Sequence, residues 1–328
     1  MQQGWNFVDL WEEYVTSSCQ ILRMALRRWV FGGDSTILKT VGSRRRQRLF
    51  SSQQSPSYPL VSWVANEDAK VGVITLESPK TLNALTVEMG FEFQTLVGEI
   101  RSKLLEGSLS LNAMVLTGAG DVAFSAGGNF DWLRSLRDQP VHANADAMLS
   151  FYKSFLCIRS LPVPVVAAIQ GPAVGAGACL ALACDLRITA PGPHKLGFTF
   201  SKLGIHSGMG GSHLLQQALG SSAQVNEILL TGKSLSGEEA LELGIVNKLS
   251  ENVKEDAFSL AQEVATQHPL AVRSMIQTLR QQQDRGLEET LQREAYAQAL
   301  CYARQDWGEG LDAVVEKRRP SFEPYANK

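Results

Sequence analysis

The chain has 328 residues, 44% hydrophobic and 20% charged, so it can bury a core and does not have the composition of a disordered protein. No uninterrupted apolar run approaches the ~20 residues that cross a bilayer. Subtracting the eight basic and four acidic residues of positions 1–50 from the totals of 31 and 33 leaves 23 basic and 29 acidic residues, a net charge of −6. We therefore predict no membrane partner, and no nucleic-acid partner because phosphates favour clustered Lys and Arg.

The N-terminal segment has the composition of a targeting sequence. Residues 43–52 are rich in Arg and Ser and contain no acid, which is typical of a mitochondrial transit peptide. Arg48-Leu49-Phe50 resembles a matrix-protease site, and Met24 begins a better presequence than Met1 because acidic residues precede it. We expect a transit segment over 1–50, a linker over 51–59 and a mitochondrial matrix location. A solvated basic arm is the alternative.

The remaining elements alternate between strand and helix. The patterns predict strands at 61–64, 71–76, 113–117, 163–170 and 186–189 and helices at 86–106 and 178–184. Beyond Glu238 the pattern becomes almost wholly helical, so we expect an α/β core followed by helices. The five cysteines show neither a CxxC pair nor metal-ligand spacing, which favours a reducing compartment and no metal.

Two segments place small residues between a strand end and a helix start, at 123–130 and 169–185. Backbone N–H groups at a helix start lack helical partners, and glycine or alanine lets a ligand approach them. Two such donors that converge on one oxygen form an oxyanion hole, which stabilises negative charge as it develops. A thioester that becomes an enolate needs this arrangement.

The second segment allows two other interpretations. Gly175-Ala-Gly177 follows an apolar strand, as in a dinucleotide-binding turn, but Leu180 stands where that fingerprint has its third glycine. The helix that follows is also too short for a dinucleotide-binding unit. A tight turn with only a structural role is the other alternative.

Five ordered segments together resemble the crotonase (enoyl-CoA hydratase/isomerase) superfamily: 78–85, 123–130, 169–185, 204–211 and 308–320. The resemblance implies an α/β fold, a spiral of ββα units with a C-terminal helical region. It implies an acyl-CoA-binding core over 60–255 and a helical trimerisation region over 256–328. It also implies an acyl-CoA thioester as substrate, a homotrimer or hexamer, and no cofactor, since coenzyme A is part of the substrate.

The resemblance also implies roles for single residues. Gly128 and Ala176 would donate the oxyanion-hole N–H groups. The residues lying along the bound substrate would be Ala126, Gly127 and Gly175.

The C-terminal segment carries a basic pair at a position that matters in the family. Lys317 and Arg318 would approach the coenzyme A phosphates, often those of a neighbouring subunit. A solvated basic end to a helix is the alternative.

The sequence departs from the hydratases at two positions. Hydratases of this family add water with two glutamates, but those positions align with Cys179 and Phe200 here. A thiol and a phenyl ring cannot together hold and deprotonate water. The catalytic groups are therefore unknown from the sequence.

Few other polar residues lie near these loops. His206 and Asp131 are weak catalytic candidates, because histidine side chains commonly transfer protons in enzymes and Asp131 follows the first loop. A structural role is the alternative for both. Asn129 could also reach the pocket, with helix capping as its alternative, and we expect structural roles for Asp185 and His213.

We therefore expect a mitochondrial acyl-CoA enzyme of enoyl-CoA hydratase/isomerase type, acting in fatty-acid or branched-chain acyl-CoA breakdown. One alternative is an acyl-CoA decarboxylase or thioester hydrolase of the same fold. A second is a non-catalytic acyl-CoA-binding subunit. RNA binding is disfavoured by the acidic body.

Overall fold

The computed structural model describes residues 58–304 and 306–322. The expected transit segment 1–50, nearly all of the linker 51–59 and the possible start at Met24 therefore lie outside the described residues.

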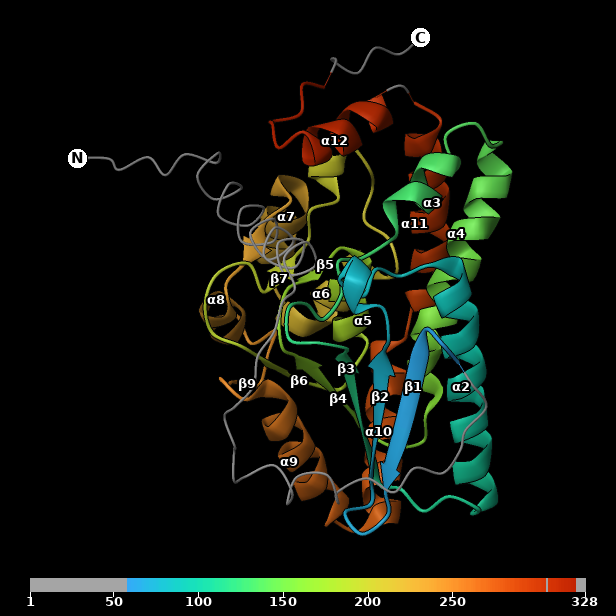
Figure 1. The fold of residues 1–328 in the computed structure, drawn as a ribbon, viewed down its shortest axis with the longest axis vertical. Coiled ribbons are helices and arrows are strands. Elements are labelled where there is room, and N and C mark those ends of the chain that lie inside the picture. The colour runs from blue at the N-terminus through green and yellow to red at the C-terminus, as the bar shows by residue number, and fades with distance from the viewer. Residues whose placement is uncertain (1–57, 305, 323–328) are drawn as a thin grey trace, which may run out of the picture.

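The main sheet has six strands in the order β1-β2-β3-β4-β6-β9, with only the β1–β2 pair antiparallel. Each later strand adds beside the preceding strand of this sheet, so the sheet grows in one direction (Figure 1). Its strands are β1 (Val61–Asn66), β2 (Val71–Leu76), β3 (Ala113–Gly118), β4 (Val165–Ile169), β6 (Leu186–Thr189) and β9 (Lys248–Leu249).

Helices cover both faces of this sheet, which explains why β3 and β4 are buried along their whole length. Alternate residues point to opposite faces: Met114 and Leu116 pack in the larger core cluster, whereas Val115 packs with Ala257 and Ala261 on the other face. The larger cluster includes residues of α2 (Val87–Glu106) and α4 (Val141–Leu156), and the smaller one lies under α9 (Val253–Ala265).

Local signals set the ends of α2. The Thr86 side chain accepts a hydrogen bond from the Met89 N–H at 3.1 Å, and Gly107 ends the helix with a φ of 76°. The other helices are α3 (Phe130–Ser135), α5 (Ala176–Leu182), α6 (Gly211–Leu219), α7 (Ser222–Thr231), α8 (Gly237–Glu242), α10 (Pro269–Gln283), α11 (Leu287–Tyr302) and α12 (Asp306–Val315). Short 3₁₀ helices lie at η1 (Pro79–Thr81), η2 (Cys157–Ser160) and η3 (Ser201–Leu203).

A second sheet of three two-residue strands crosses the middle of the molecule. It consists of β5 (Ala173–Val174), β7 (Leu196–Gly197) and β8 (Ser234–Leu235). Strands this short have no detectable periodicity, and the sequence analysis did not predict them. They matter because β5 carries the second glycine-bearing loop directly into α5.

The predicted α/β class and the C-terminal helical region are confirmed. The expected boundary between 255 and 256 falls inside α9, whose alanines pack against the sheet. This helix therefore belongs with the core rather than with the helices that follow. No helix within residues 58–304 and 306–322 is both long and apolar enough to cross a membrane.

Candidate active site

A cavity of about 750 Å³ lies between the two glycine-bearing loops, α4 and α11. Gly128 and Ala176 both line it, as do Ala126, Gly127 and Gly175. The structure therefore brings all five predicted residues of the two loops to one cavity.

The first loop is anchored by its backbone and by Ser125. The Leu85 N–H donates to the Gly127 carbonyl at 2.7 Å, and the Asn129 N–H donates to the Leu85 carbonyl at 2.9 Å. In this bridge the N–H of Gly128 points away from Leu85. The Ser125 hydroxyl donates to the Asn83 carbonyl at 2.7 Å and accepts from the Gly127 N–H at 3.2 Å.

The second loop lies directly beside the first. The Val174 N–H donates to the Ser125 carbonyl at 3.0 Å, and a Cβ on Gly127 would come within 2.4 Å of the Val174 carbonyl oxygen. Only glycine allows this approach, and Gly127 also has a φ of 89°. The close packing places the Gly128 and Ala176 backbones on adjacent walls.

Both predicted donor groups are available to a ligand. Ala176 is the first residue of α5, where N–H groups have no helical partner. Among the described residues, neither the Gly128 nor the Ala176 N–H donates a hydrogen bond within the chain. The arrangement can therefore bind an oxygen that carries developing negative charge.

Neither position expected to hold a hydratase glutamate carries a group that activates water. Cys179 is fully buried behind the cavity, and its thiol donates to the Gly208 carbonyl at 3.4 Å. Burial, and secondarily the charge of Glu294, raises the pKa of the Cys179 thiol well above its usual value. Phe200 lines the cavity with its ring.

The weak catalytic candidates do not line this cavity. His206 is half-buried and lines a second cleft, with its Nδ1 atom 2.7 Å from the Ser207 carbonyl. Asp131 is exposed on α3 and is not among the residues of the cavity wall. Asn129 accepts a hydrogen bond from the Trp132 N–H at 2.9 Å and so caps α3. The Nε2 atom of His213 on α6 lies 2.6 Å from the carbonyl oxygen of Gln283 on α10.

Sequence reasoning missed a polar group in the cavity wall formed by α4 and α11. The hydroxyls of Tyr152 and Tyr302 donate to the Gln298 side-chain oxygen at 2.6 and 3.1 Å, and the Gln298 amide donates to the His206 carbonyl at 2.7 Å. Burial is the main reason that the pKa of Tyr152 lies well above its usual value, so its hydroxyl stays protonated. The available signal was that Gln298 stands among apolar positions in the helical pattern predicted beyond Glu238, where a buried polar group needs a partner.

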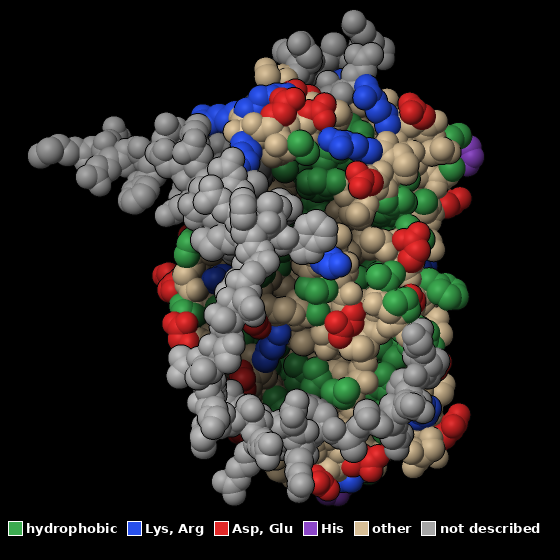
Figure 2. Space-filling view, viewed as in Figure 1, with side chains coloured by type: hydrophobic (Ala, Val, Ile, Leu, Met, Phe, Trp, Pro, Cys, Tyr) green, Lys and Arg blue, Asp and Glu red, His purple; other side chains and the backbone are tan. Residues whose placement is uncertain are grey.

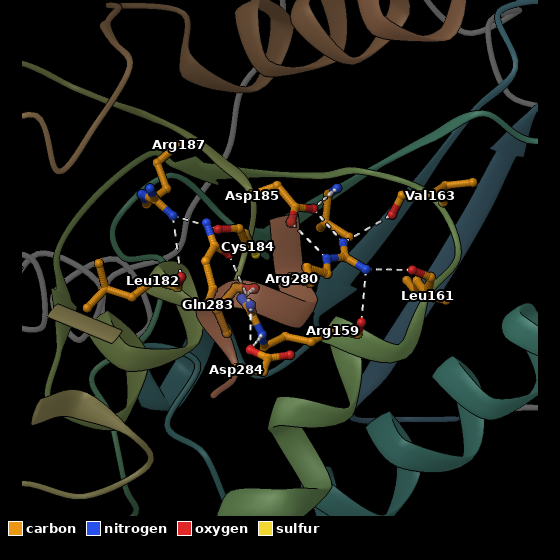
Figure 3. Close-up of polar contacts among 12 residues, drawn as sticks. Arg159, Leu161, Val163, Leu182, Cys184, Asp185, Arg187, Arg280, Gln283 and Asp284 are labelled. Carbon is orange, nitrogen blue, oxygen red and sulfur yellow. Dashed lines mark hydrogen bonds and ion pairs between the residues drawn. The ribbon is translucent and has the colours of Figure 1, made fainter. Parts of the chain in front are cut away.

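Arginines fix the end of α5 opposite Ala176 (Figure 3). Arg187 donates to the Leu182 and Cys184 carbonyls, and Arg159 donates to the Ala183 carbonyl at 3.1 Å. These cations meet the unsatisfied carbonyls of a helix C-terminus, where they are stabilising. The loop and the helix that carry Ala176 are therefore held at both ends.

Asp185 and Arg280 form a buried ion pair next to these arginines. The guanidinium reaches the two carboxylate oxygens at 2.8 and 2.5 Å and donates to the Arg159, Leu161 and Val163 carbonyls (Figure 3). The Val165 N–H donates to the same carboxylate at 2.7 Å. Asp185 thus orders the start of β4 and has no contact with the cavity wall.

The C-terminal segment lies over the same cavity. Val314 of α12 lines the cavity, and Asp312 pairs with Arg134 of α3 at 3.3 Å. Lys317 is exposed, whereas Arg318 is bound to Glu309 and Glu316. Charged side chains gather at this end of the molecule, above hydrophobic ones (Figure 2). No cluster of three or more potential metal ligands occurs in the part of the chain that the structure describes.

Comparisons with known proteins agree with this architecture. Residues 66–325 match the family model described as enoyl-CoA hydratase/isomerase. The short-chain-enoyl-CoA hydratase of Clostridium acetobutylicum is 29% identical over 267 residues, which cover 81% of this chain and 98% of that protein. A Dictyostelium discoideum protein named "Probable enoyl-CoA hydratase, mitochondrial" is 28% identical over 290 residues, covering 87% and 98%. The crystal structure of an enoyl-CoA hydratase/isomerase from Mycobacterium paratuberculosis is 25% identical with a TM-score of 0.67, covering 79% and 98%.

Proposed function

Because the chain belongs to the enoyl-CoA hydratase/isomerase family of the crotonase superfamily, we propose that it binds an acyl-CoA thioester and stabilises the enolate formed from it. The Gly128 and Ala176 N–H groups bind the thioester oxygen. The observation that carries this proposal is that both groups line one cavity and neither is used within the described chain.

The chemistry follows from where the charge moves. When a bond at the α-carbon breaks, the electron pair of that bond is delocalised onto the thioester oxygen. When a nucleophile adds to the β-carbon, the electron pair of the carbon–carbon double bond is delocalised there instead. Two fixed N–H donors stabilise that oxygen more strongly in the transition state than in the ground state. The apolar walls strengthen the interaction, because they exclude water from the site.

A decarboxylase of the same fold is the second candidate, favoured by Cys179 and Phe200 at the two glutamate positions. A thioester hydrolase is a weaker alternative, because hydrolysis needs activated water as hydration does. In decarboxylation the bond between the α-carbon and the carboxylate breaks, carbon dioxide leaves, and the electron pair becomes the enolate. This step needs no general base, so the oxyanion hole alone can promote it. Addition of water to an enoyl thioester has no such advantage here. A non-catalytic acyl-CoA-binding subunit would share the ligand but not the turnover.

The cellular setting is also part of the proposal. We place the chain in the mitochondrial matrix, in fatty-acid or branched-chain acyl-CoA breakdown. The Arg-rich segment before Ser51 supports this location, and so does the similarity to the Dictyostelium protein named as mitochondrial.

The assembly we propose is a homotrimer or hexamer. Exposed apolar side chains on the outer helices support it, because a monomer rarely leaves such groups in water together. They are Leu270, Met275 and Leu279 on α10 and Tyr296 and Leu300 on α11.

The first experiment offers crotonyl-CoA, longer enoyl-CoA esters and malonyl-type esters to the chain that begins at Ser51. Loss of the conjugated thioester absorbance reports hydration, and release of carbon dioxide reports decarboxylation. Rapid hydration would show that other groups replace the two glutamates. Failure to bind any coenzyme A ester would refute the proposal.

The variant Ala176→Pro tests the oxyanion hole directly. Proline is tolerated at the first position of a helix but has no N–H, so the helix is kept while one donor is lost. We expect kcat to fall by about 10²–10³-fold with a smaller change in KM. Ser222→Pro, at the first position of α7, is the matched control and should leave kcat unchanged. Equal effects of the two prolines would contradict the assigned role of Ala176.

A further inference from the structure

A second hollow lies next to the cavity of the proposed site. It is a cleft of about 630 Å³, lined in part by Ser207, Ser212 and Glu294. Glu294 is buried and accepts hydrogen bonds from both serine hydroxyls at 3.1 and 2.6 Å. The cleft therefore combines apolar residues with a buried carboxylate that accepts hydrogen bonds.

Two side chains belong to the walls of both hollows. Phe200 and Ile205 line the cavity and also the cleft, so they form the partition between them. Both are buried, with 7% of each residue exposed.

The Phe200 ring stands beside the oxyanion loop. A Cβ built on Gly175 would lie 3.8 Å from one edge of the ring, and one built on Gly211 would lie 3.8 Å from the other edge. The ring thus fills the space between the two backbones. Because Gly175 precedes the donor Ala176, the first carbons of a bound acyl group would meet this ring.

From this geometry we infer that Phe200 determines the width of the acyl group that the site accepts. The ring closes the cavity on the side of the cleft, so narrow straight-chain acyl groups fit and aryl or bulky branched groups do not. Removing the ring joins the cavity to the cleft and leaves space for a group of phenyl size. This inference rests on the proposed binding of an acyl-CoA thioester.

The experiment compares butyryl-CoA with 3-phenylpropionyl-CoA by calorimetric titration of the wild-type chain and the Phe200→Ala variant. Burying a phenyl group contributes about 1.5–3 kcal/mol, and 1.4 kcal/mol corresponds to tenfold in affinity. We therefore expect the variant to bind the aryl thioester at least about tenfold more tightly than the wild type does. Butyryl-CoA should bind equally or more weakly.

Two matched variants separate the partition from simple enlargement. Met148→Ala widens only the cavity, because Met148 lines the cavity and not the cleft. Leu229→Ala widens only the cleft. Neither should reproduce the gain, whereas Ile205→Ala should reproduce it in part. Phe200→Leu should fold as the wild type does and show an intermediate gain.

The outcomes distinguish the two levels of the proposal. If the wild type binds butyryl-CoA and Phe200→Ala gains nothing for the aryl thioester, the partition has no role in selectivity and the inference is overturned. A gain of equal size in Met148→Ala would overturn it as well. If the wild type binds neither thioester, the proposed function fails and the inference falls with it.

Discussion

Single residues decide which chemistry the site retains. In the proposed site Gly128 and Ala176 bind the oxyanion, while Cys179 and Phe200 stand at the positions that the resemblance assigns to the water-activating glutamates. Cys179 is not an alternative nucleophile, because its thiol is buried and contacts a carbonyl. Phe200 lines the cavity with an uncharged ring, which limits the space for a ligand.

The variant Cys179→Ala tests the thiol. Burial raises the pKa of this group, so the folded protein holds it as the neutral thiol at and above its usual titration range. We expect kcat for the preferred coenzyme A ester, measured between pH 7 and 9, to change by less than about threefold in the variant. The dependence of kcat on pH should stay the same. If the change of kcat at alkaline pH seen in the wild type were missing in Cys179→Ala, a thiolate would take part in the reaction.

At this scale the two loops predicted from the sequence line one cavity, whereas the sequence did not reveal the rest of the cavity wall. The two glycine-bearing loops carry their own signal, because small residues between a strand and a helix are informative locally. The hydrogen bond between Tyr152 and Gln298 joins residues 146 positions apart, and a single sequence does not reveal such a pairing. The position of His206 in the cleft depends on the same tertiary packing.

Among the elements, α5 depends on its surroundings more than on its own length. It has seven residues, too few for independent stability, yet it carries the Ala176 N–H. Arg159 and Arg187 bind its last carbonyls, and Asp185 and Arg280 fix the strand beside it. The predicted helix 178–184 began two residues late, because Gly175-Ala-Gly177 looks like a turn from sequence alone.

Replacing Arg280 tests this support. Arg280→Met leaves Asp185 buried without its partner, so we expect the free energy of unfolding to fall by about 3–5 kcal/mol. Lys153→Met removes an exposed pair with Glu288 and should cost at most about 1 kcal/mol. Denaturant unfolding of the two variants gives the comparison. Equal losses would show that the buried pair has no special role.

At the scale of the whole molecule, α12 lies over the cavity, and α10 and α11 expose apolar side chains. The resemblance implied basic residues from a neighbouring subunit, whereas here α12 lies over the cavity of its own chain through Val314. The apolar side chains of α10 and α11 remain available for other copies.

Assembly is tested by light scattering of the chain that begins at Ser51. We expect three or six times the mass of one chain. Leu270→Glu with Leu279→Glu should lower the mass to that of one chain, because each buried apolar side chain contributes roughly 1.5–3 kcal/mol. Leu105→Glu, at an exposed position of α2, is the matched control. A wild type with the mass of one chain would contradict the proposed assembly.

The contacts of Arg280 also affect the order in which parts of the chain can fold during synthesis. This residue joins carbonyls near position 160 and the carboxylate of Asp185, about a hundred positions earlier in the chain. Until α10 has been synthesised, the Val163 carbonyl before β4 and the Asp185 carboxylate both lack the guanidinium of Arg280. Contacts so distant in sequence form late, because closing long loops is entropically costly. The core therefore cannot complete these contacts before α10, which lies in the last quarter of the chain, has been synthesised.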